Sequence, residues 1–243
     1  MRIIKLNAID STNAYLKRKQ ITGTLEDYTI VIAEHQKEGR GQMGTQWDAE
    51  PSKNLTFSIF KHVDFVSYTH QFYISMAVAL GVTKALKTLQ IPKLAIKWPN
   101  DILAERKKIG GILIENSIKQ GQLSFSVIGI GLNVNQKFFN NLPKASSLHI
   151  LTGKLYSIEE LMMTILEGIQ HYFEIFEAKN YKSIKSEYEA LLFRKHKPST
   201  FRTLSEGIFT GYINGISDDG KLEVLVEDQI IKTYDLKEIE LQY

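Results

Sequence analysis

The chain has 243 residues, of which 43% are hydrophobic and 23% are charged, a composition typical of a soluble globular protein with a sizeable core. Its net charge of +3 is too small to indicate nucleic acid as a bulk ligand. The absence of cysteine excludes disulfides and thiol chemistry, and we find neither a signal peptide nor a membrane-length apolar run, so we expect a cytoplasmic protein.

The first sixty residues predict a helix and two strands that a long polar loop connects. The run Asp10-Ser11-Thr12-Asn13 is typical of a helix N-terminus. Residues 29–34 are apolar and β-branched, which predicts a strand. Residues 35–53 are polar, rich in glycine and without periodicity, and such long loops are usually functional. Apolar and small polar residues alternate over residues 55–59, which predicts a half-buried strand.

The middle of the chain predicts helices around a set of short strands. Apolar residues at helical spacing over residues 72–89 predict a helix, with Thr69 as a possible cap. The run Ser157-Ile158-Glu159-Glu160 fits a capping box that starts a helix to about residue 176. A second helix is predicted over residues 181–194. The strands are predicted around residues 95–98, 109–118 and 123–134, with a turn at Gln120-Gly121.

The pattern changes near residue 197. From residue 201 onward, short strands are separated by Asn214-Gly215 and Asp219-Gly220, two hairpin signals that indicate a small β-barrel. We therefore predict a domain of residues 1–196 and a smaller one of residues 197–243. The larger part mixes helices with hairpin-connected strands, so we expect an α+β fold rather than a regular βαβ alternation.

The glycine-rich loop is the first candidate for chemistry. It contains Gly39-Arg40-Gly41-Gln42-Met43-Gly44, whose backbone can approach a ligand closely and form an anion-binding nest. Arg40 adds a fork of donors suited to phosphate or carboxylate. A mobile surface loop is the alternative, because glycine often only punctuates a chain. The spacing is neither a Walker A motif nor a dinucleotide-binding fingerprint.

Three further motifs combine turns or glycines with polar side chains. In Lys97-Trp98-Pro99-Asn100-Asp101 the turn can direct a lysine and a carboxylate toward phosphates and magnesium, or can be turn chemistry alone. In residues 107–115 a lysine leads into a strand with Gly110-Gly111, which indicates close packing on the backbone, or simply a bulge. In residues 129–135 Asn133 can bond a base or ribose, or can end a strand. The six histidines lack metal-ligand spacing.

In this order and spacing, the segments resemble the biotin–protein ligase family. The resemblance runs from Ser11-Thr12-Asn13 through residues 39–47, 97–101 and 108–115 to residues 129–133, and it covers nearly the whole chain. It implies a catalytic core related to class II aminoacyl-tRNA synthetases, with a mixed sheet and flanking helices. The C-terminal hairpins look like the small SH3-like domain of that family.

The resemblance implies an ATP-dependent ligase that activates biotin to biotinyl-5'-AMP. Biotin would then pass to one lysine of a biotin carboxyl carrier protein. ATP with Mg²⁺ is the implied cosubstrate, without assigned metal ligands, and pairing of sheet edges could give a homodimer. Regulatory members carry a helix-turn-helix domain before the core, whereas Ser11 here lies ten residues into the chain, so we expect no binding to operator DNA.

The resemblance also implies the site residues. Around biotin it implies Ser11, Thr12, Asn13, Gln36, Gly39, Arg40, Trp47, Lys108, Gly111 and Gly129. On the nucleotide side it implies Arg40, Gly41, Gln42, Lys97, Asn100, Asp101 and Asn133. Lys108 and Arg40 are the expected catalytic residues, because two anions must meet when the biotin carboxylate attacks ATP.

Three positions depart from the pattern of the family. Basic residues are common where this chain has Gln42 and Thr45, and an arginine is common near the position of Gln242. These departures concern individual nucleotide contacts, not the reaction. A lipoate–protein ligase, which shares the adenylate chemistry, is the nearest alternative function, and a biotin-binding regulator without transfer activity is another.

Overall fold

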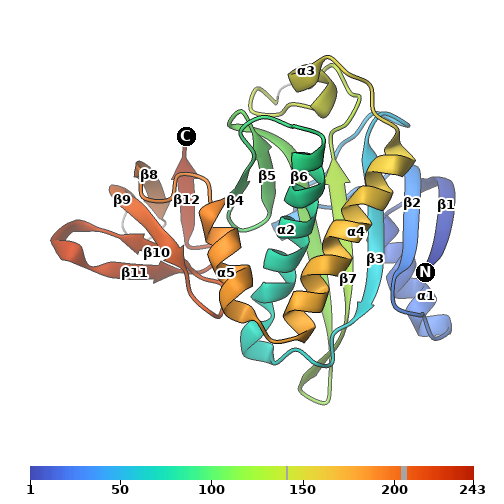
Figure 1. The fold of residues 1–243 in the computed structure, drawn as a ribbon, viewed down its shortest axis with the longest axis horizontal. Coiled ribbons are helices and arrows are strands. Elements are labelled where there is room, and N and C mark those ends of the chain that lie inside the picture. Colours follow the sequence, from blue (N-terminus) through green and yellow to red (C-terminus); the bar gives the residue numbers. More distant parts are fainter. Residues whose placement is uncertain (141, 204–206) are drawn as a thin grey trace.

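The computed structural model describes residues 1–140, 142–203 and 207–243, which form two sheets with helices around the larger one (Figure 1). The larger sheet has the strand order β1-β2-β3-β7-β6-β5-β4. Strands β1 and β2 are parallel, and the other neighbours are antiparallel. The predicted α+β class is confirmed. The strands are β1 (Arg2–Ile9), β2 (Thr29–Gln36), β3 (Leu55–His62), β4 (Ala95–Lys97), β5 (Asp101–Ala104), β6 (Lys107–Lys119) and β7 (Gln122–Leu132).

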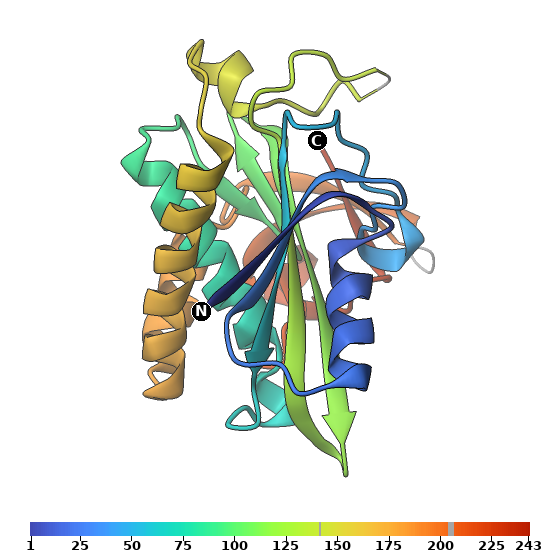
Figure 2. The same ribbon diagram turned by 90° about the vertical axis from the view of Figure 1, so that its right-hand side faces the viewer.

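Helices cover both faces of this sheet, as Figure 2 shows. The two long helices, α2 (Phe72–Thr88) and α4 (Ile158–Glu177), lie side by side on one face, and α1 (Thr12–Thr22) lies on the other. The long helices meet at two glycines, because a Cβ atom on Gly168 would lie 2.4 Å from the carbonyl oxygen of Gly81. Only glycine lets the two backbones approach this closely.

Strand β3 is more buried than its alternating pattern predicts. Leu55, Phe57 and Ile59 face the main hydrophobic core, as expected. Thr56 and Ser58 on the opposite face are also buried, because that face carries α1 instead of solvent. The predicted half-buried strand is therefore wrong in this respect.

Several predicted boundaries differ from the structure. Helix α2 has Gln71 at its N-cap position, without a side-chain cap, and Thr69 belongs to the preceding 3-10 turn Tyr68–His70. Helix α5 (Tyr181–Ala190) ends before the predicted residue 194. It ends there because the chain turns to bond β4: the Ile96 N–H donates to the Leu191 carbonyl oxygen at 2.8 Å. Strands β1 and β5 and helix α3 (Leu148–Thr152) were not predicted.

The smaller sheet is antiparallel, with the strand order β11-β10-β9-β8-β12. The predicted turn at Asp219-Gly220 connects β9 to β10. The predicted turn at Asn214-Gly215 is wrong, because both residues lie inside β9. Gly215 serves a close approach instead, since its Cβ atom would lie 2.8 Å from a carboxylate oxygen of Glu189. The strands are β8 (Pro198–Thr203), β9 (Gly207–Ile216), β10 (Leu222–Leu225), β11 (Ile231–Tyr234) and β12 (Ile239–Gln242).

The turn between β9 and β10 is one of the contacts that attach the smaller sheet to the larger part. The indole N–H of Trp98 donates to the Gly220 carbonyl oxygen at 2.9 Å. Asp218 accepts a hydrogen bond from Tyr73 at 3.2 Å and pairs with Lys185 at 2.8 Å. Buried residues of both sheets form one continuous core, while the division into domains at residue 197 stays a prediction. None of the helices in the described part of the chain is long and apolar enough to cross a membrane.

Candidate functional site

One cavity of about 690 Å³ brings most of the predicted site residues together. Its walls are the start of α1, the glycine-rich loop, strands β5, β6 and β7, and the edge of the smaller sheet. All residues predicted around biotin line it except Gly39, and all residues predicted around the nucleotide line it except Asn133. Four separate motifs in the sequence thus converge on one space.

Hydroxyl and amide groups form one wall of the cavity. Ser11 caps helix α1, which brings Thr12 and Asn13 to its first turn. The backbone N–H and the hydroxyl of Thr12 both donate to the side-chain oxygen of Gln36, at 2.8 and 3.0 Å. Ser58, which the sequence reading did not assign to the site, lies at 2.7 Å from the Thr12 hydroxyl and 2.6 Å from the Asn13 oxygen. The cluster offers paired donors and acceptors to a polar ligand edge.

Glu115 on β6 holds the Asn13 side chain in this cluster. Its carboxylate accepts from the Asn13 amide at 2.9 Å and pairs with Lys17 at 2.8 Å. Burial alone raises the pKa of Glu115, but the hydrogen bonds from Lys17 and Asn13 outweigh it and lower the pKa overall. The charged form of Glu115 is therefore favoured, and it orients the asparagine.

Glycines form the floor of the cavity. Gly129 and Gly131 lie on β7, and Gly111 lies beside Gly131 on β6. A Cβ atom on Gly131 would lie 2.4 Å from the Trp47 indole ring, and one on Gly129 would lie 2.5 Å from the Asn13 oxygen. The absence of side chains on these strands therefore lets the Trp47 ring and the Asn13 side chain pack directly against the strand backbones.

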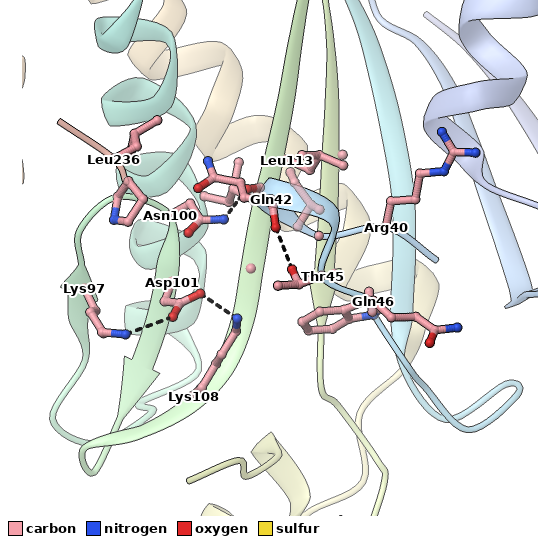
Figure 3. Close-up of a pocket in the computed structure, with 18 of the residues that line it drawn as sticks. Arg40, Gln42, Thr45, Gln46, Lys97, Asn100, Asp101, Lys108, Leu113 and Leu236 are labelled. Carbon is pink, nitrogen blue, oxygen red and sulfur yellow. Dashed lines mark hydrogen bonds and ion pairs between the residues drawn. The ribbon is translucent and has the colours of Figure 1, made fainter. Parts of the chain in front are cut away.

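The glycine-rich loop closes on itself through its backbone. The Gly41 N–H donates to the Thr45 carbonyl oxygen at 2.7 Å, and the Trp47 N–H donates to Gly39 at 2.9 Å. Gly39 lies outside the cavity lining because it faces the Trp47 backbone, only 2.3 Å from where its Cβ atom would be. Arg40 is exposed, and its guanidinium points away from Lys108 (Figure 3).

A charged cluster forms the opposite side of the cavity. Asp101 lies between two lysines, at 2.6 Å from Lys108 and 3.6 Å from Lys97 (Figure 3). The Asn100 amide donates to the carbonyl oxygen of Ile112 at 2.8 Å, which fixes the turn against β6. The Lys97–Asp101 motif and Lys108 of β6 thus place two cations and one carboxylate together, a set that suits phosphate groups.

Asn133 lies apart from the cavity. It is buried at the end of β7, where its amide donates to the Ser146 carbonyl oxygen at 3.0 Å. Its backbone N–H donates to Ile109 at 2.7 Å. These bonds hold the segment that follows β7 against the start of β6, so the predicted contact with a nucleotide has no support in this arrangement.

The smaller sheet supplies lining residues that the sequence reading missed. They are Arg202, Thr203 and the run Leu236-Lys237-Glu238-Ile239-Glu240. No motif marked them, because they reach the cavity only through the packing of the two sheets. Among the described residues, no group of three or more His, Asp or Glu side chains is placed to hold a metal ion.

Comparisons with known proteins agree with this arrangement. The model of the Biotin/lipoate A/B protein ligase family matches residues 6–133. The bifunctional ligase/repressor BirA of Escherichia coli (strain K12) is 30% identical over 98% of this chain and 73% of that protein. BirA of Bacillus subtilis (strain 168) is 31% identical over 85% of this chain, which spans 64% of that protein.

Solved structures extend the match to the whole fold. The biotin protein ligase from Aquifex aeolicus in complex with biotin and ATP has a TM-score of 0.82 and 28% identity, covering 99% of this chain and 98% of that chain. Its apo structure has a TM-score of 0.78 and 26% identity. By its sequence motifs, its cavity and these matches, the chain belongs to the biotin/lipoate A/B protein ligase family.

Proposed function

We propose that the protein activates biotin with ATP and transfers it to a lysine of a biotin carboxyl carrier protein. One observation carries the proposal: a single cavity joins a wall of hydroxyl and amide groups to a cluster of lysines, Lys97 and Lys108. The wall of hydroxyl and amide groups can recognise a neutral polar ring, and the two lysines can hold phosphates. The similarity to a ligase that binds biotin and ATP supports the same reading.

Biotin fits the end of the cavity near helix α1. Its ureido edge needs donors and acceptors in pairs, which Ser11, Thr12 and Gln36 offer. Its apolar bicycle needs a flat, non-polar surface, which the Trp47 ring, packed on the glycine floor, would provide. Its carboxylate would then extend toward Lys108, whose ammonium group lies 5.9 Å from the centre of the Trp47 ring.

In the first step, a carboxylate oxygen of biotin attacks the α-phosphorus of ATP. A new oxygen–phosphorus bond forms while the bond to the bridging oxygen breaks, and pyrophosphate leaves with the electron pair. Lys108 would stabilise the charge on the phosphoryl oxygens. The Arg40 guanidinium points away from Lys108 in this structure. Arg40 would join Lys108 at the phosphoryl oxygens when the glycine-rich loop orders over the ligands.

The nucleotide would enter as its magnesium complex. Magnesium in such complexes is held mainly by phosphate oxygens and water, with one or two carboxylates from the protein. Asp101 is a carboxylate in the lysine cluster and would take this role when the phosphates draw Lys97 and Lys108 away. The ion would offset charge on the leaving pyrophosphate.

In the second step, the amine of the carrier lysine attacks the carbonyl carbon of biotinyl-5'-AMP. A carbon–nitrogen bond forms, the bond to the phosphate oxygen breaks, and AMP leaves while the amine loses a proton.

A cytoplasmic location and a homodimer through a sheet edge stay predictions. Strand β1 is one edge of the larger sheet.

Pyrophosphate release tests the proposal. The protein should release pyrophosphate from ATP when biotin is present, and mass spectrometry should then show one biotinyl group on a carrier domain. Parallel reactions with lipoate and octanoate test the alternative acids. Release with lipoate but not with biotin would contradict the proposed substrate. Release with biotin but without transfer to any carrier domain would indicate a regulator.

A further inference from the structure

The ring of Tyr243 contacts two lysines beside the charged cluster. The Lys97 ammonium lies 5.1 Å from the centre of this ring, and the Lys144 ammonium lies 4.3 Å from it. Both distances are within the range of a cation–π contact. Phe193 packs its ring edge to face against Tyr243, at 5.2 Å between centroids. Tyr243 does not line the cavity itself, whereas Lys97 does.

Tyr243 is fixed from a second direction by the segment that follows β7. The ammonium of Lys144 donates to the backbone carbonyl oxygen of Tyr243 in addition to its contact with the ring. The same segment bonds the backbone of Lys108 on both sides: the Lys108 N–H donates to Lys144 at 2.7 Å, and the Ser146 N–H donates to Lys108 at 2.9 Å. The ring that contacts Lys97 and the backbone that carries Lys108 thus share one support.

The environment of Tyr243 favours an uncharged ring. Burial, and secondly the nearby Asp101 carboxylate, raise the pKa of its hydroxyl. A neutral aromatic ring attracts a cation through its π face. Asp101 is already bound closely to Lys108, at 2.6 Å, and lies farther from Lys97, at 3.6 Å. The carboxylate alone therefore holds Lys97 loosely.

We propose that Tyr243 is a positioning residue for Lys97, whose ammonium its ring holds at the phosphate side of the cavity before the nucleotide arrives. The proposal rests on the proposed function, because it assigns Lys97 to the phosphates of ATP. Tyr243 touches neither substrate. Its effect is to keep a flexible side chain close to the position where the anion binds, so that less conformational freedom is lost on binding.

Steady-state kinetics of pyrophosphate release test the proposal. Tyr243→Leu should raise KM for ATP roughly two- to fivefold, since a cation–π contact at a partly exposed site contributes about 0.5–1 kcal/mol and 1.4 kcal/mol is tenfold. KM for biotin should not change. Tyr243→Phe keeps the ring and should restore most of the parent's KM for ATP. In a Lys97→Met background, Tyr243→Leu should have no further effect on KM for ATP.

Controls separate this role from general damage. Tyr212 is an exposed tyrosine on β9 of the same sheet, and Tyr212→Leu should leave both KM values unchanged. Equal rises in KM for ATP and biotin, or an additive effect in the Lys97→Met background, would overturn the proposal. So would an unchanged KM for ATP in Tyr243→Leu. If the parent protein releases no pyrophosphate with biotin, the proposed function itself has failed, and direct titration with ATP then tests Tyr243 independently.

Discussion

Lys108 is the residue whose loss should most clearly slow the first step. Preorganised donors of this kind typically contribute about 2.7–4 kcal/mol, so Lys108→Ala should slow pyrophosphate release roughly a hundred- to thousandfold. The neighbouring Lys107 is exposed and does not line the cavity, which makes Lys107→Ala a matched control. Rapid-quench measurement of pyrophosphate gives the rate. Equal damage from the two substitutions would refute the role of Lys108.

Gln42 should determine how long the reactive adenylate stays bound. Its side chain lines the cavity, whereas its backbone oxygen accepts the bonds that shape the loop, from the Thr45 N–H at 3.1 Å and the Thr45 hydroxyl at 2.7 Å. Gln42→Arg therefore keeps the loop and adds a charge. Charge-assisted hydrogen bonds contribute about 1.5–3 kcal/mol, so dissociation of biotinyl-5'-AMP should slow about tenfold or more.

A chase of bound biotinyl-5'-AMP with unlabelled ligand measures this dissociation. Gln122→Arg adds the same charge at an exposed position of β7 that does not line the cavity and should have no effect. If release from Gln42→Arg matches the parent, other cations of the site already compensate for the missing arginine.

At the scale of single residues, most of the cavity could be predicted from the sequence. Short motifs such as Lys97–Asp101 keep their members together whatever the fold does, and the residues that the resemblance implied there line one cavity. Arg202 could not be found in this way, because it is a lone arginine on a strand and only the packing of the two sheets brings it to the cavity. Asn133 is the opposite case: it belongs to a motif near the site, but its side chain bonds the Ser146 backbone and does not line the cavity.

At the scale of elements, the contact between α2 and α4 should tolerate no side chain at its crossing. A Cβ atom on Gly168 would lie 2.4 Å from the Gly81 carbonyl oxygen, and overpacking of this kind typically costs about 1–3 kcal/mol. Gly168→Ala should lower the free energy of unfolding in urea by this amount. Gly23 has an extended backbone, and no atom of the described residues would lie within 4 Å of a Cβ atom there, so Gly23→Ala serves as the control. Equal stability of the two variants would show that the helices separate easily.

The types of the elements were predicted better than the contacts that each element makes with other elements. The turn at Gln120-Gly121 has both residues at positive φ, 52° and 77°, and a local signal of that kind is sufficient to predict a hairpin. Asn214-Gly215 carries the same type of turn signal but lies inside β9. Its glycine is needed for another reason, the close approach of Glu189 from α5, which the local sequence does not show. The burial of Ser58 likewise depends on α1, which the alternation within one strand cannot reveal.

At the scale of the molecule, the bond from Trp98 to Gly220 should stabilise the attachment of the smaller sheet. Trp98→Phe removes this donor and leaves a buried carbonyl unsatisfied, which costs about 1–3 kcal/mol. The buried indole N–H of Trp47 has no hydrogen-bond partner among the described residues, so Trp47→Phe loses similar volume without losing a bond. Denaturant unfolding should show the larger loss for Trp98→Phe. A larger loss for Trp47→Phe would contradict the assignment.

The shared wall of the cavity has a thermodynamic consequence. Arg202 lies on β8 of the smaller sheet, and residues 236–240 form the turn before β12 and its start. Ligand binding and the docking of that sheet are therefore linked equilibria. Linkage is reciprocal: the factor by which a ligand favours the docked sheet equals the factor by which docking favours the ligand. Substrates should therefore slow amide hydrogen exchange around Gly220, which does not line the cavity, and the protein should be most resistant to local opening when both substrates are bound.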